Sequence, residues 1–346
     1  MLRCIELAKN GLGTTYPNPL VGSVIVHDDT IIGEGWHHIS GGPHAEVHAV
    51  ENVDRPELLT QATLYVNLEP CSHHGRTPPC ADMIIQKGIK RIVIGSTDPN
   101  PKVQGGGIQK LRNAGCEVVV GVLKAECDEL NKRFFTSFLK KRPYIILKWA
   151  QTQDGFIAPE MQSSEKAWSE RSPFWITNTQ SRQRVHKMRA EEHAILVGTN
   201  TVLADNPGLT TRLWQGNSPV RVVLDRKGII PVEASVLNRE TKTIIITEVP
   251  KVSDGNLTYE TADFSGDLVS QLCAILHRPE IRSVIVEGGA QTLQSFIDSD
   301  CWDEAFVFTG PGILKQGLAA PSFSGTQVYE EQIQTDTLQI FKNEAS

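Results

Sequence analysis

Three side chains in the first part of the chain have the chemistry of metal ligands. His44 opens the sequence HAE, and Cys71 and Cys80 follow it, each directly after a proline and with eight residues between them. One imidazole and two thiolates suit tetrahedral zinc and leave its fourth position open to water. Zinc held in this way lowers the pKa of that water to near neutrality, so the pattern predicts one catalytic zinc ion.

Glu46 lies two residues after His44 and supplies a carboxylate beside the metal. Attack of activated water on an aromatic carbon requires protons to move to a ring nitrogen and to a leaving amine, and a carboxylate that does not bind the metal can carry them. The pattern is similar to the H-x-E…P-C-x-x-C pattern of zinc-dependent base deaminases, except that eight residues rather than two separate the cysteines. We therefore expect Glu46 to be the catalytic proton carrier of a deaminase.

Two other metal sites compete with this interpretation. His44 and His48 have the i,i+4 spacing of a zincin, although the zincin motif places its glutamate directly after the first histidine. His73 or His74 could supply a fourth protein ligand, and a closed shell of four ligands would make the zinc structural. In that second case the chain would be a non-catalytic zinc-binding interaction protein.

The residues around these ligands alternate between strand and helix patterns. Apolar, β-branched runs predict strands, and amphipathic stretches between them predict helices. The predicted strands are 21–26, 63–68, 91–94 and 117–120, and the predicted helices are about 44–52, 80–87 and 107–114. This order is typical of a layered α/β domain.

A domain boundary is predicted near residue 142. A cationic segment ends at Pro143, and a new apolar strand begins at 144. Beyond it the alternation restarts, with helices at about 179–190 and 265–277 and strands at 194–198, 220–224, 243–247, 283–287 and about 304–309. Residues 158–173 have no clear periodicity and are expected to form an inserted surface loop. The sequence therefore predicts two α/β domains, 1–142 and 143–346.

Length and composition agree with two globular domains. The 346 residues are 40% hydrophobic and 21% charged, which excludes a disordered chain. The formal net charge of −6 provides no basic field for a nucleic-acid backbone. No signal-peptide core and no apolar stretch of about 18 residues occurs, which predicts a cytoplasmic protein without a membrane segment. Seven cysteines in a long chain indicate reduced thiols, and we expect those outside the metal site to be buried: Cys4, Cys116, Cys127, Cys273 and Cys301.

Segments of the first domain resemble a known family. TTYPNPLVGSVIV, GEGWHHISGGPHAEVHAV and LYVNLEPCSHHGRTPPC are similar to the deaminase domain of bifunctional riboflavin-biosynthesis enzymes, which join a diaminohydroxyphosphoribosylaminopyrimidine deaminase to a 5-amino-6-(5-phosphoribosylamino)uracil reductase. The resemblance extends over essentially the whole chain, and the C-x8-C spacing is its most specific part. It implies a cytidine-deaminase-like three-layer α/β domain in which His44, Cys71 and Cys80 hold zinc and Glu46 moves protons. Asn18 is a candidate for the pyrimidine edge, because its amide both donates and accepts, although it could equally be a turn former.

Segments of the second domain resemble the reductase half of the same family. They are LKWA at 147–150, WITN at 175–178, VGTNTVLADNP at 197–207 and LTTR at 209–212. The resemblance implies an α/β fold similar to dihydrofolate reductase, with NADPH as the hydride donor. It implies cofactor contacts at Ala150, Trp175, Thr201, Asp205 and Gly289, and substrate contacts at Lys148, Arg189, Leu209, Arg212 and Glu287.

Two of these predicted binding features are also supported by the chemistry of the residues themselves. The strand at 283–287 leads through a glycine pair into a helix whose amino end can receive a dinucleotide phosphate, although an ordinary tight turn has the same pattern. Arg189 and Arg212 suit a ribose phosphate, because guanidinium groups bind phosphate oxygens two at a time. Each could instead be a solvated surface arginine.

The second domain departs from the family pattern before Trp175. TQD at 152–154 stands where the family usually has Ser-Leu-Asp, and the stretch that follows is longer than the common form. Residues 172–174 replace the usual approach to the tryptophan. The serine that normally contacts substrate therefore has no clear equivalent.

Together these features predict a bifunctional enzyme of riboflavin biosynthesis. Zinc-dependent hydrolysis would remove the 2-amino group of 2,5-diamino-6-(5-phosphoribosylamino)pyrimidin-4(3H)-one, and NADPH would then reduce the ribosyl group of 5-amino-6-(5-phosphoribosylamino)uracil to ribityl. The partners would be these small molecules, with no nucleic acid and no membrane, and an open-edged sheet permits a homo-oligomer. The rival is a deaminase of tRNA or free nucleosides, which would have two residues between its cysteines and no reductase half.

Overall fold

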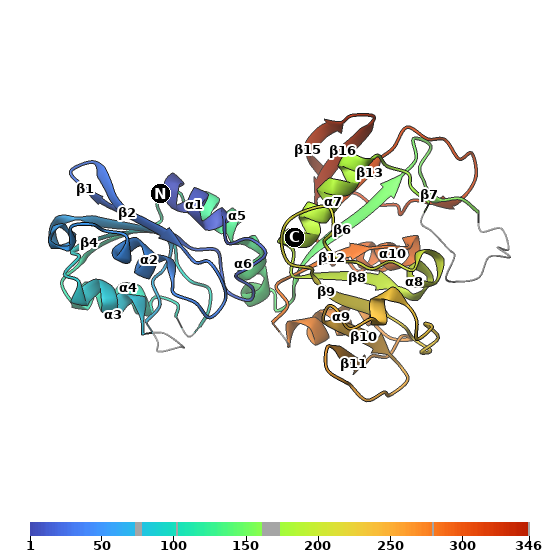
Figure 1. Cartoon of the computed structure of the whole chain (residues 1–346), viewed down its shortest axis with the longest axis horizontal. Coiled ribbons are helices and arrows are strands. Elements are labelled where there is room, and N and C mark those ends of the chain that lie inside the picture. The colour runs from blue at the N-terminus through green and yellow to red at the C-terminus, as the bar shows by residue number, and fades with distance from the viewer. Residues whose placement is uncertain (73–77, 102, 161–173, 279, 345–346) are drawn as a thin grey trace. The chain divides into compact units, whose positions relative to one another are not determined.

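Figure 1 shows the computed structural model of the chain, which describes residues 1–72, 78–101, 103–160, 174–278 and 280–344. The chain forms two compact units, Met1–Lys141 and Arg142–Ser346, which divide one residue before the predicted boundary. Within the described ranges, no helix combines the length and the apolar character needed to cross a membrane.

The first unit is built on a sheet of five strands in the order β2-β1-β3-β4-β5. β1 is antiparallel to β2 and β3, whereas β3, β4 and β5 are parallel. The strands are β1 (Gly22–His27), β2 (Thr30–Trp36), β3 (Thr63–Leu68), β4 (Arg91–Ser96) and β5 (Glu117–Val120). The α-helices are α1 (Leu2–Lys9), α2 (Ala45–Glu51), α3 (Cys80–Gln86), α4 (Gly106–Asn113), α5 (Lys124–Leu130) and α6 (Lys132–Leu139).

Helices pack on both faces of this sheet. Leu64 and Val66 of β3 lie in one core cluster with residues of α2, α3 and α4. Tyr65, between them, packs against the opposite cluster, in which Leu7 of α1 meets Val24 of β1. Successive side chains of a strand point to opposite faces, so one strand supplies both cores. The unit therefore has the three α/β layers that the sequence predicts.

The second unit is built on a sheet of nine strands in the order β11-β10-β9-β8-β12-β6-β13-β16-β15. The strands from β11 to β13 in this order are parallel, and β16 and β15 add antiparallel pairings. They are β6 (Tyr144–Gln151), β8 (Ala194–Gly198), β9 (Val220–Leu224), β10 (Thr243–Thr247), β11 (Leu257–Thr261), β12 (Ser283–Glu287), β13 (Glu304–Thr309), β15 (Thr326–Ile333) and β16 (Asp336–Lys342). A separate pair joins β7 (Phe156–Ala158) to β14 (Leu318–Ala319), and the α-helices are α7 (Thr179–Glu191), α8 (Thr199–Asp205), α9 (Leu268–His277) and α10 (Ala290–Asp298).

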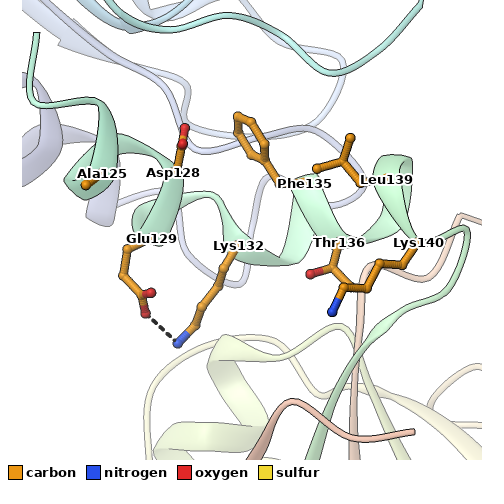
Figure 2. Close-up of a pocket in the computed structure, with 8 residues that line it drawn as sticks. All are labelled: Ala125, Asp128, Glu129, Lys132, Phe135, Thr136, Leu139 and Lys140. Atoms are coloured by element: carbon orange, nitrogen blue, oxygen red, sulfur yellow. Dashed lines mark hydrogen bonds and ion pairs between the residues drawn. The ribbon is translucent and has the colours of Figure 1, made fainter. Parts of the chain in front are cut away.

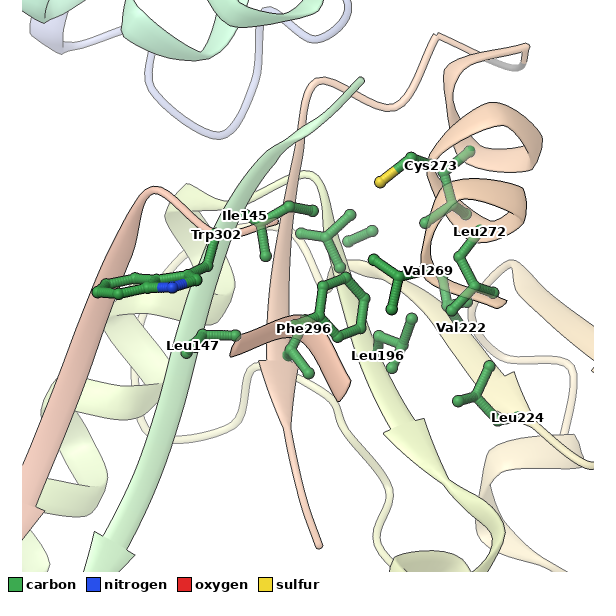
Figure 3. Packing of buried hydrophobic residues seen from close by; sticks show 14 of the residues in the cluster. Ile145, Leu147, Leu196, Val222, Leu224, Val269, Leu272, Cys273, Phe296 and Trp302 are labelled. Carbon is green, nitrogen blue, oxygen red and sulfur yellow. The ribbon is translucent and has the colours of Figure 1, made fainter. Parts of the chain in front are cut away.

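Two apolar cores enclose this larger sheet. Ile145 and Leu147 of β6 pack with Phe296 of α10 and with residues of α9 in one cluster (Figure 3). Ile146, between them, packs with Val185 of α7 in the other. A parallel sheet covered on both faces gives continuous apolar runs in the sequence. The strands at 194–198, 220–224, 243–247 and 283–287 accordingly begin and end where the sequence predicts.

Some features differ from expectation. The sequence analysis did not identify the helices α1, α5, α6 and α8, the strands β2, β7, β11 and β14, or the β15–β16 hairpin. Most of the predicted inserted loop lies outside the described residues. Cys4, Cys116, Cys127 and Cys273 are buried, as expected. Cys301 is only half-buried, which corrects the prediction for that thiol.

Candidate active site

Three elements bring the predicted metal ligands together. His44 directly precedes α2, Cys71 lies in the loop after β3, and Cys80 is the first residue of α3. The Nδ1 atom of His44 is 3.2 Å from the sulfur of Cys80 and 3.5 Å from that of Cys71. One nitrogen and two sulfurs at these separations fit a single tetrahedral zinc ion. Among the described residues, no other group of three such ligands comes together in this way.

The start of α3 favours a thiolate at Cys71. The backbone N–H of Cys80 donates to the sulfur of Cys71 at 3.2 Å, and the N–H of Ala81 donates to its carbonyl oxygen at 3.1 Å. The hydrogen bond from the thiol of Cys80, helped by His44, lowers the pKa of Cys71 to about 4 against the opposing effect of burial. A thiolate is the form of cysteine that binds metal, so these groups are electrostatically suited to a cation.

Glu46 lies in the first turn of α2, beside the ligands but not among them. It is 3% exposed. Burial raises the pKa of its carboxyl, and the charge of the neighbouring His44 opposes that effect. A raised pKa makes a carboxyl better able to take up a proton and pass it on. The arrangement can therefore move protons next to a bound metal.

A contact that the sequence analysis missed connects Asn18 to this cluster. The side-chain nitrogen of Asn18 is 3.1 Å from Nε2 of His37, and Nδ1 of His37 is 2.9 Å from the carbonyl oxygen of Pro43. Because a carbonyl only accepts, Nδ1 carries the proton and Nε2 accepts from Asn18. The His37 ring lies edge-on to that of His44, with centroids 5.5 Å apart. Its burial lowers its pKa, which agrees with a neutral imidazole.

The zincin alternative does not fit this geometry. The ring of His48 stacks on that of His38 with centroids 4.2 Å apart, and its Nδ1 lies 4.0 Å from a carboxylate oxygen of Glu51. His48 is not part of the ligand cluster. The alternative fourth ligands, His73 and His74, lie outside the described residues.

In the second unit, three predicted substrate residues form a buried ion-pair network. Lys148 of β6 and Glu287 of β12 are register partners, and their side chains meet with Nζ 2.8 Å from Oε1. Arg189 of α7 donates to Oε2 of the same carboxylate, also at 2.8 Å. Burial would raise the pKa of Glu287, but the charges of Arg189 and Lys148 outweigh it and hold this pKa well below its usual range. Two cations thus share one anion, which leaves the group with net positive charge.

The loop that carries Arg212 is attached to the same helix. The backbone N–H of Arg212 donates to Nδ1 of His186 at 3.0 Å, and Nη1 of Arg189 donates to the carbonyl oxygen of Thr210 at 3.4 Å. His186 and Arg189 are three residues apart on α7 and so lie on one face of it. Leu209, at the start of this loop, is 2% exposed and packs in the core. Leu209 is therefore a core residue here, and its predicted substrate contact stays a prediction.

Two segments predicted to bind cofactor, the first turn of α8 and the turn after β12, contact each other. The backbone N–H of Gly289 donates to the hydroxyl of Thr201 at 3.0 Å. Gly288 has a φ of 142°, and a Cβ at that position would lie 2.7 Å from the same hydroxyl. Glycine is therefore required where β12 turns into α10. The amino end of α10 follows directly and is suited to a phosphate.

No contact with the glycine turn is given by the described part of the chain for the other predicted cofactor residues, Ala150, Asp205 and Trp175. Ala150 is half-buried near the end of β6. Asp205 ends α8, and burial, with a contribution from Glu287, raises its pKa. Trp175 is 56% exposed, and the guanidinium of Arg182 lies 4.5 Å from the centroid of its ring.

The turn at 152–154 is well ordered although it departs from the family pattern. The hydroxyl of Thr152 donates to Asp154 at 2.6 Å, and the backbone N–H of Lys315 donates to the same carboxylate at 2.7 Å. Residues 172 and 173, which replace the usual approach to the tryptophan, lie outside the described residues.

A groove of about 350 Å³ runs along α5 and α6 of the first unit (Figure 2). An ion pair of 3.0 Å joins Lys132 to Glu129 in its lining. The full lining consists of Ala125, Asp128, Glu129, Lys132, Phe135, Thr136, Leu139 and Lys140. None of these is a histidine or a cysteine, so the groove is separate from the metal cluster.

Comparison with known families agrees with both halves of this description. The family described as "Cytidine and deoxycytidylate deaminase zinc-binding region" matches residues 1–96, and the family described as "RibD C-terminal domain" matches residues 143–344. The chain belongs to the RibD family. A deaminase of tRNA or free nucleosides would not carry the second match, so that rival is not supported.

Relatives match nearly the whole chain. The riboflavin biosynthesis protein RibD of Aquifex aeolicus is 44% identical over 324 residues, which cover 92% of this chain and 88% of that protein. RibD of Escherichia coli is 38% identical over 332 residues, covering 91% and 87%. The crystal structure of a diaminohydroxyphosphoribosylaminopyrimidine deaminase/5-amino-6-(5-phosphoribosylamino)uracil reductase from Thermotoga maritima matches with a TM-score of 0.87 and 41% identity, covering 99% of this chain and 97% of that one.

Membership of the RibD family confirms the predicted fold and the predicted type of enzyme. The chain has a cytidine-deaminase-like first half and a RibD reductase second half. It is a bifunctional deaminase and NADPH-dependent reductase of riboflavin biosynthesis. The roles of individual residues stay predictions.

Proposed function

We propose that the chain catalyses two successive steps. The first unit removes the 2-amino group of 2,5-diamino-6-(5-phosphoribosylamino)pyrimidin-4(3H)-one by hydrolysis, and the second reduces the ribosyl group of 5-amino-6-(5-phosphoribosylamino)uracil to ribityl with NADPH. The observation that carries the proposal is the buried carboxyl of Glu46 beside the cluster of His44, Cys71 and Cys80. The similar protein from Thermotoga maritima, a deaminase and reductase in one chain, supports it.

In the deaminase, the chain's own residues bind the metal and move the protons. Nδ1 of His44 and the sulfurs of Cys71 and Cys80 would hold the zinc ion, since their separations fit its coordination distances. When bound, zinc activates water for attack on the ring carbon that carries the amine. Glu46 would carry the two protons of the attacking water in turn, the first to the ring nitrogen and the second to the amine, which then leaves as ammonia. Asn18, with its nitrogen engaged by His37, presents its oxygen to donors on the pyrimidine edge.

In the reductase, the cations bind the substrate and the glycine turn binds the cofactor. Arg189, Arg212 and Lys148 provide donors for the ribose phosphate, and Glu287 keeps two of these side chains in place. The turn at Gly288 and Gly289 fits a dinucleotide phosphate, because glycine lets the backbone approach closely. NADPH, when bound, supplies the hydride. Small pyrimidine phosphates are then the partners, and a cytoplasmic homo-oligomer remains a prediction.

The substitution Glu46→Gln tests the proposal in one chain. Ammonia release should fall by at least about 10²-fold, because proton transfer is lost, while NADPH oxidation on the deaminated intermediate stays unchanged. Glu51→Gln is the matched control, since Glu51 is an exposed residue of the same helix. Loss of both activities in Glu46→Gln would contradict independent sites, and unchanged ammonia release would contradict the role of Glu46.

X-ray absorption at the zinc edge tests the ligand set. The proposal requires two sulfurs, one nitrogen and one water oxygen around the metal. A shell of two sulfurs and two nitrogens would favour the structural site completed by His73 or His74, and the deaminase assignment would fail.

A further inference from the structure

A buried carboxylate next to the metal ligands takes no part in the chemistry described above. Glu69 follows β3, two residues before Cys71, and is 4% exposed. Burial of a carboxylate is costly unless hydrogen bonds compensate for the lost water. The partners of Glu69 therefore indicate why the chain places a carboxylate here.

Within the described part of the chain, the Glu69 side chain accepts four hydrogen bonds, all from backbone N–H groups between Asp98 and Ile108. Oε1 accepts from Gly107 at 3.0 Å and from Ile108 at 3.2 Å. Oε2 accepts from Asp98 at 3.2 Å and from Gly105 at 3.0 Å. These donors belong to the loop before α4 and to its first turn, where neither a side-chain cap nor an acidic residue of the helix is present. The amino end of a helix favours a nearby negative charge, and for α4 this charge comes from Glu69, which lies outside the helix.

The segment that Glu69 holds lies directly against the backbone around Cys71. A Cβ on Gly107 would lie 1.9 Å from the carbonyl oxygen of Pro70, and a Cβ on Gly106 would lie 2.8 Å from the hydroxyl oxygen of Ser72. The start of α4 therefore touches the residues on either side of Cys71.

Cys71 is also held from the side of α3. The N–H groups of Cys80 and Ala81 donate to its sulfur and its carbonyl oxygen. An ion pair of 2.5 Å between Lys110 and Asp82 joins α4 to α3. Contacts from α3 and from the start of α4 thus fix the position of Cys71.

We propose that Glu69 is the positioning residue for the Cys71 ligand. Its carboxylate fixes residues 105–108, at the start of α4, against Pro70 and Ser72, and this contact sets the backbone from which the thiolate reaches the metal. Metal sites tolerate only about 0.2 Å of variation in ligand distance, so a loosened backbone weakens binding. The inference rests on the proposed zinc site.

The substitution Glu69→Gln is a sharp test because of the symmetry of the contacts. Each carboxylate oxygen accepts two N–H groups, so in either orientation the new NH₂ group faces two donors. Glu57→Gln is the matched control, since Glu57 is an exposed glutamate of the same unit. Both variants lose one negative charge, but only the first disturbs the start of α4.

Zinc affinity, measured by competition with a chelator in the full-length protein, is the main readout. Glu69→Gln should weaken zinc binding by about 10–100-fold, the range typical for residues that orient metal ligands. The absorption spectrum of the cobalt-substituted protein should shift, because the sulfur ligand moves. Glu57→Gln should leave both unchanged, and NADPH oxidation by the second unit should be normal in both variants.

Two neighbouring glycines provide a second test that keeps the carboxylate. Gly107→Ala places a methyl group against the backbone of Pro70 and should weaken zinc binding, whereas Gly106→Ala meets only the rotatable hydroxyl of Ser72 and should change it little. If protease digestion shows that Glu69→Gln unfolds the first unit, this pair of alanine variants tests the proposal instead. Equal zinc affinity in the two alanine variants would then overturn the proposal.

The outcomes separate this inference from the zinc site on which it rests. If the wild-type protein binds zinc, His44→Ala abolishes binding and a folded Glu69→Gln binds like wild type, then Glu69 does not position Cys71. If the wild-type protein binds no zinc, or His44→Ala has no effect on binding, the proposed metal site itself is wrong.

Discussion

Replacement of Glu287 by glutamine would leave two buried cations without their shared counter-charge. Glu287 accepts one hydrogen bond from Lys148 and one from Arg189, both at 2.8 Å. The three side chains are only 11–16% exposed. Glutamine keeps the shape of the side chain but removes the charge that makes both contacts favourable.

The expected loss of stability follows from this burial. Removal of one partner from a buried ion pair costs about 3–5 kcal/mol, because an uncompensated charge remains. A unit of this size loses about 2–4 °C of melting temperature for each kcal/mol, so Glu287→Gln should unfold about 6–20 °C below the wild type. Differential scanning calorimetry at pH 7 measures this difference.

The dependence on pH provides a further check. The pKa of Glu287 in the folded protein is held below its usual value, so its stabilising effect is complete above the unfolded value of about 4.3. As the pH falls below that value, the unfolded state takes up the proton first, and the advantage of the wild type shrinks by about 1.4 kcal/mol per pH unit. The two proteins should therefore become more alike between pH 5 and pH 3.

Glu260→Gln is the control for this experiment. Glu260 pairs with Arg278 in the same unit, at 3.2 Å, but the two side chains are 40% and 66% exposed. Exposed pairs contribute about 1 kcal/mol or less, so this variant should melt close to the wild type. The reasoning fails if Glu287→Gln melts like the control, or if its deficit is as large at pH 3 as at pH 7.

Three further results are expected. Treatment with a strong zinc chelator should stop ammonia release and leave NADPH oxidation intact, which a coupled assay with the two readings taken separately would show. Burial is the main reason that the pKa of His186 is lowered to about 4. The folded state therefore binds fewer protons than the unfolded state, and the free energy of unfolding falls as the pH drops from about 6.5 towards 4. Urea titrations of His186→Gln should show a weaker dependence of this free energy on pH over that interval. Phe296→Ala empties a fully buried position in the larger core (Figure 3) and should cost about 3–5 kcal/mol, seen as a lower denaturant midpoint at unchanged slope.

The parts of the fold that the sequence predicts well are those buried on both sides. β3 and β12 are mostly buried strands with apolar residues at their centres, and both have the predicted ends. β2 was missed because glycines and a glutamate interrupt its apolar pattern. β15 was missed because it is a mostly exposed strand at the edge of its sheet. Most of its residues are polar, so it lacks the apolar run that predicts a buried strand.

Helix α6 shows how a local signal can mislead. Its cationic residues and the proline that follows resemble a linker. The segment is helical because Phe134 and Phe138, one turn apart, pack with ring centroids 4.7 Å apart on one face. Spacing of aromatic residues was the better guide here than charge.

The candidate site divides in the same way. Side chains with a distinctive chemistry, such as His44 and Cys71, could be predicted as metal ligands from residue type and spacing, and the fold brings them together. The contact between Asn18 and His37 depends on the fold, although the histidine stands in a segment that resembles the family. Glu69 also stands in a segment that resembles the family, but its role could not be predicted, because its hydrogen bonds with described residues all come from backbone N–H groups, which any sequence supplies.

The strand order of the larger sheet bears on how the protein is synthesised. β6 is made first in its unit, yet it lies between β12 and β13, and Glu287 follows its register partner Lys148 by 139 residues. The first unit is complete at Lys141 and can fold while the ribosome is still at work. β6 cannot pair with both of its neighbours in the sheet until β12 and β13 have been synthesised. Interrupted translation should therefore leave a protein that releases ammonia but oxidises no NADPH.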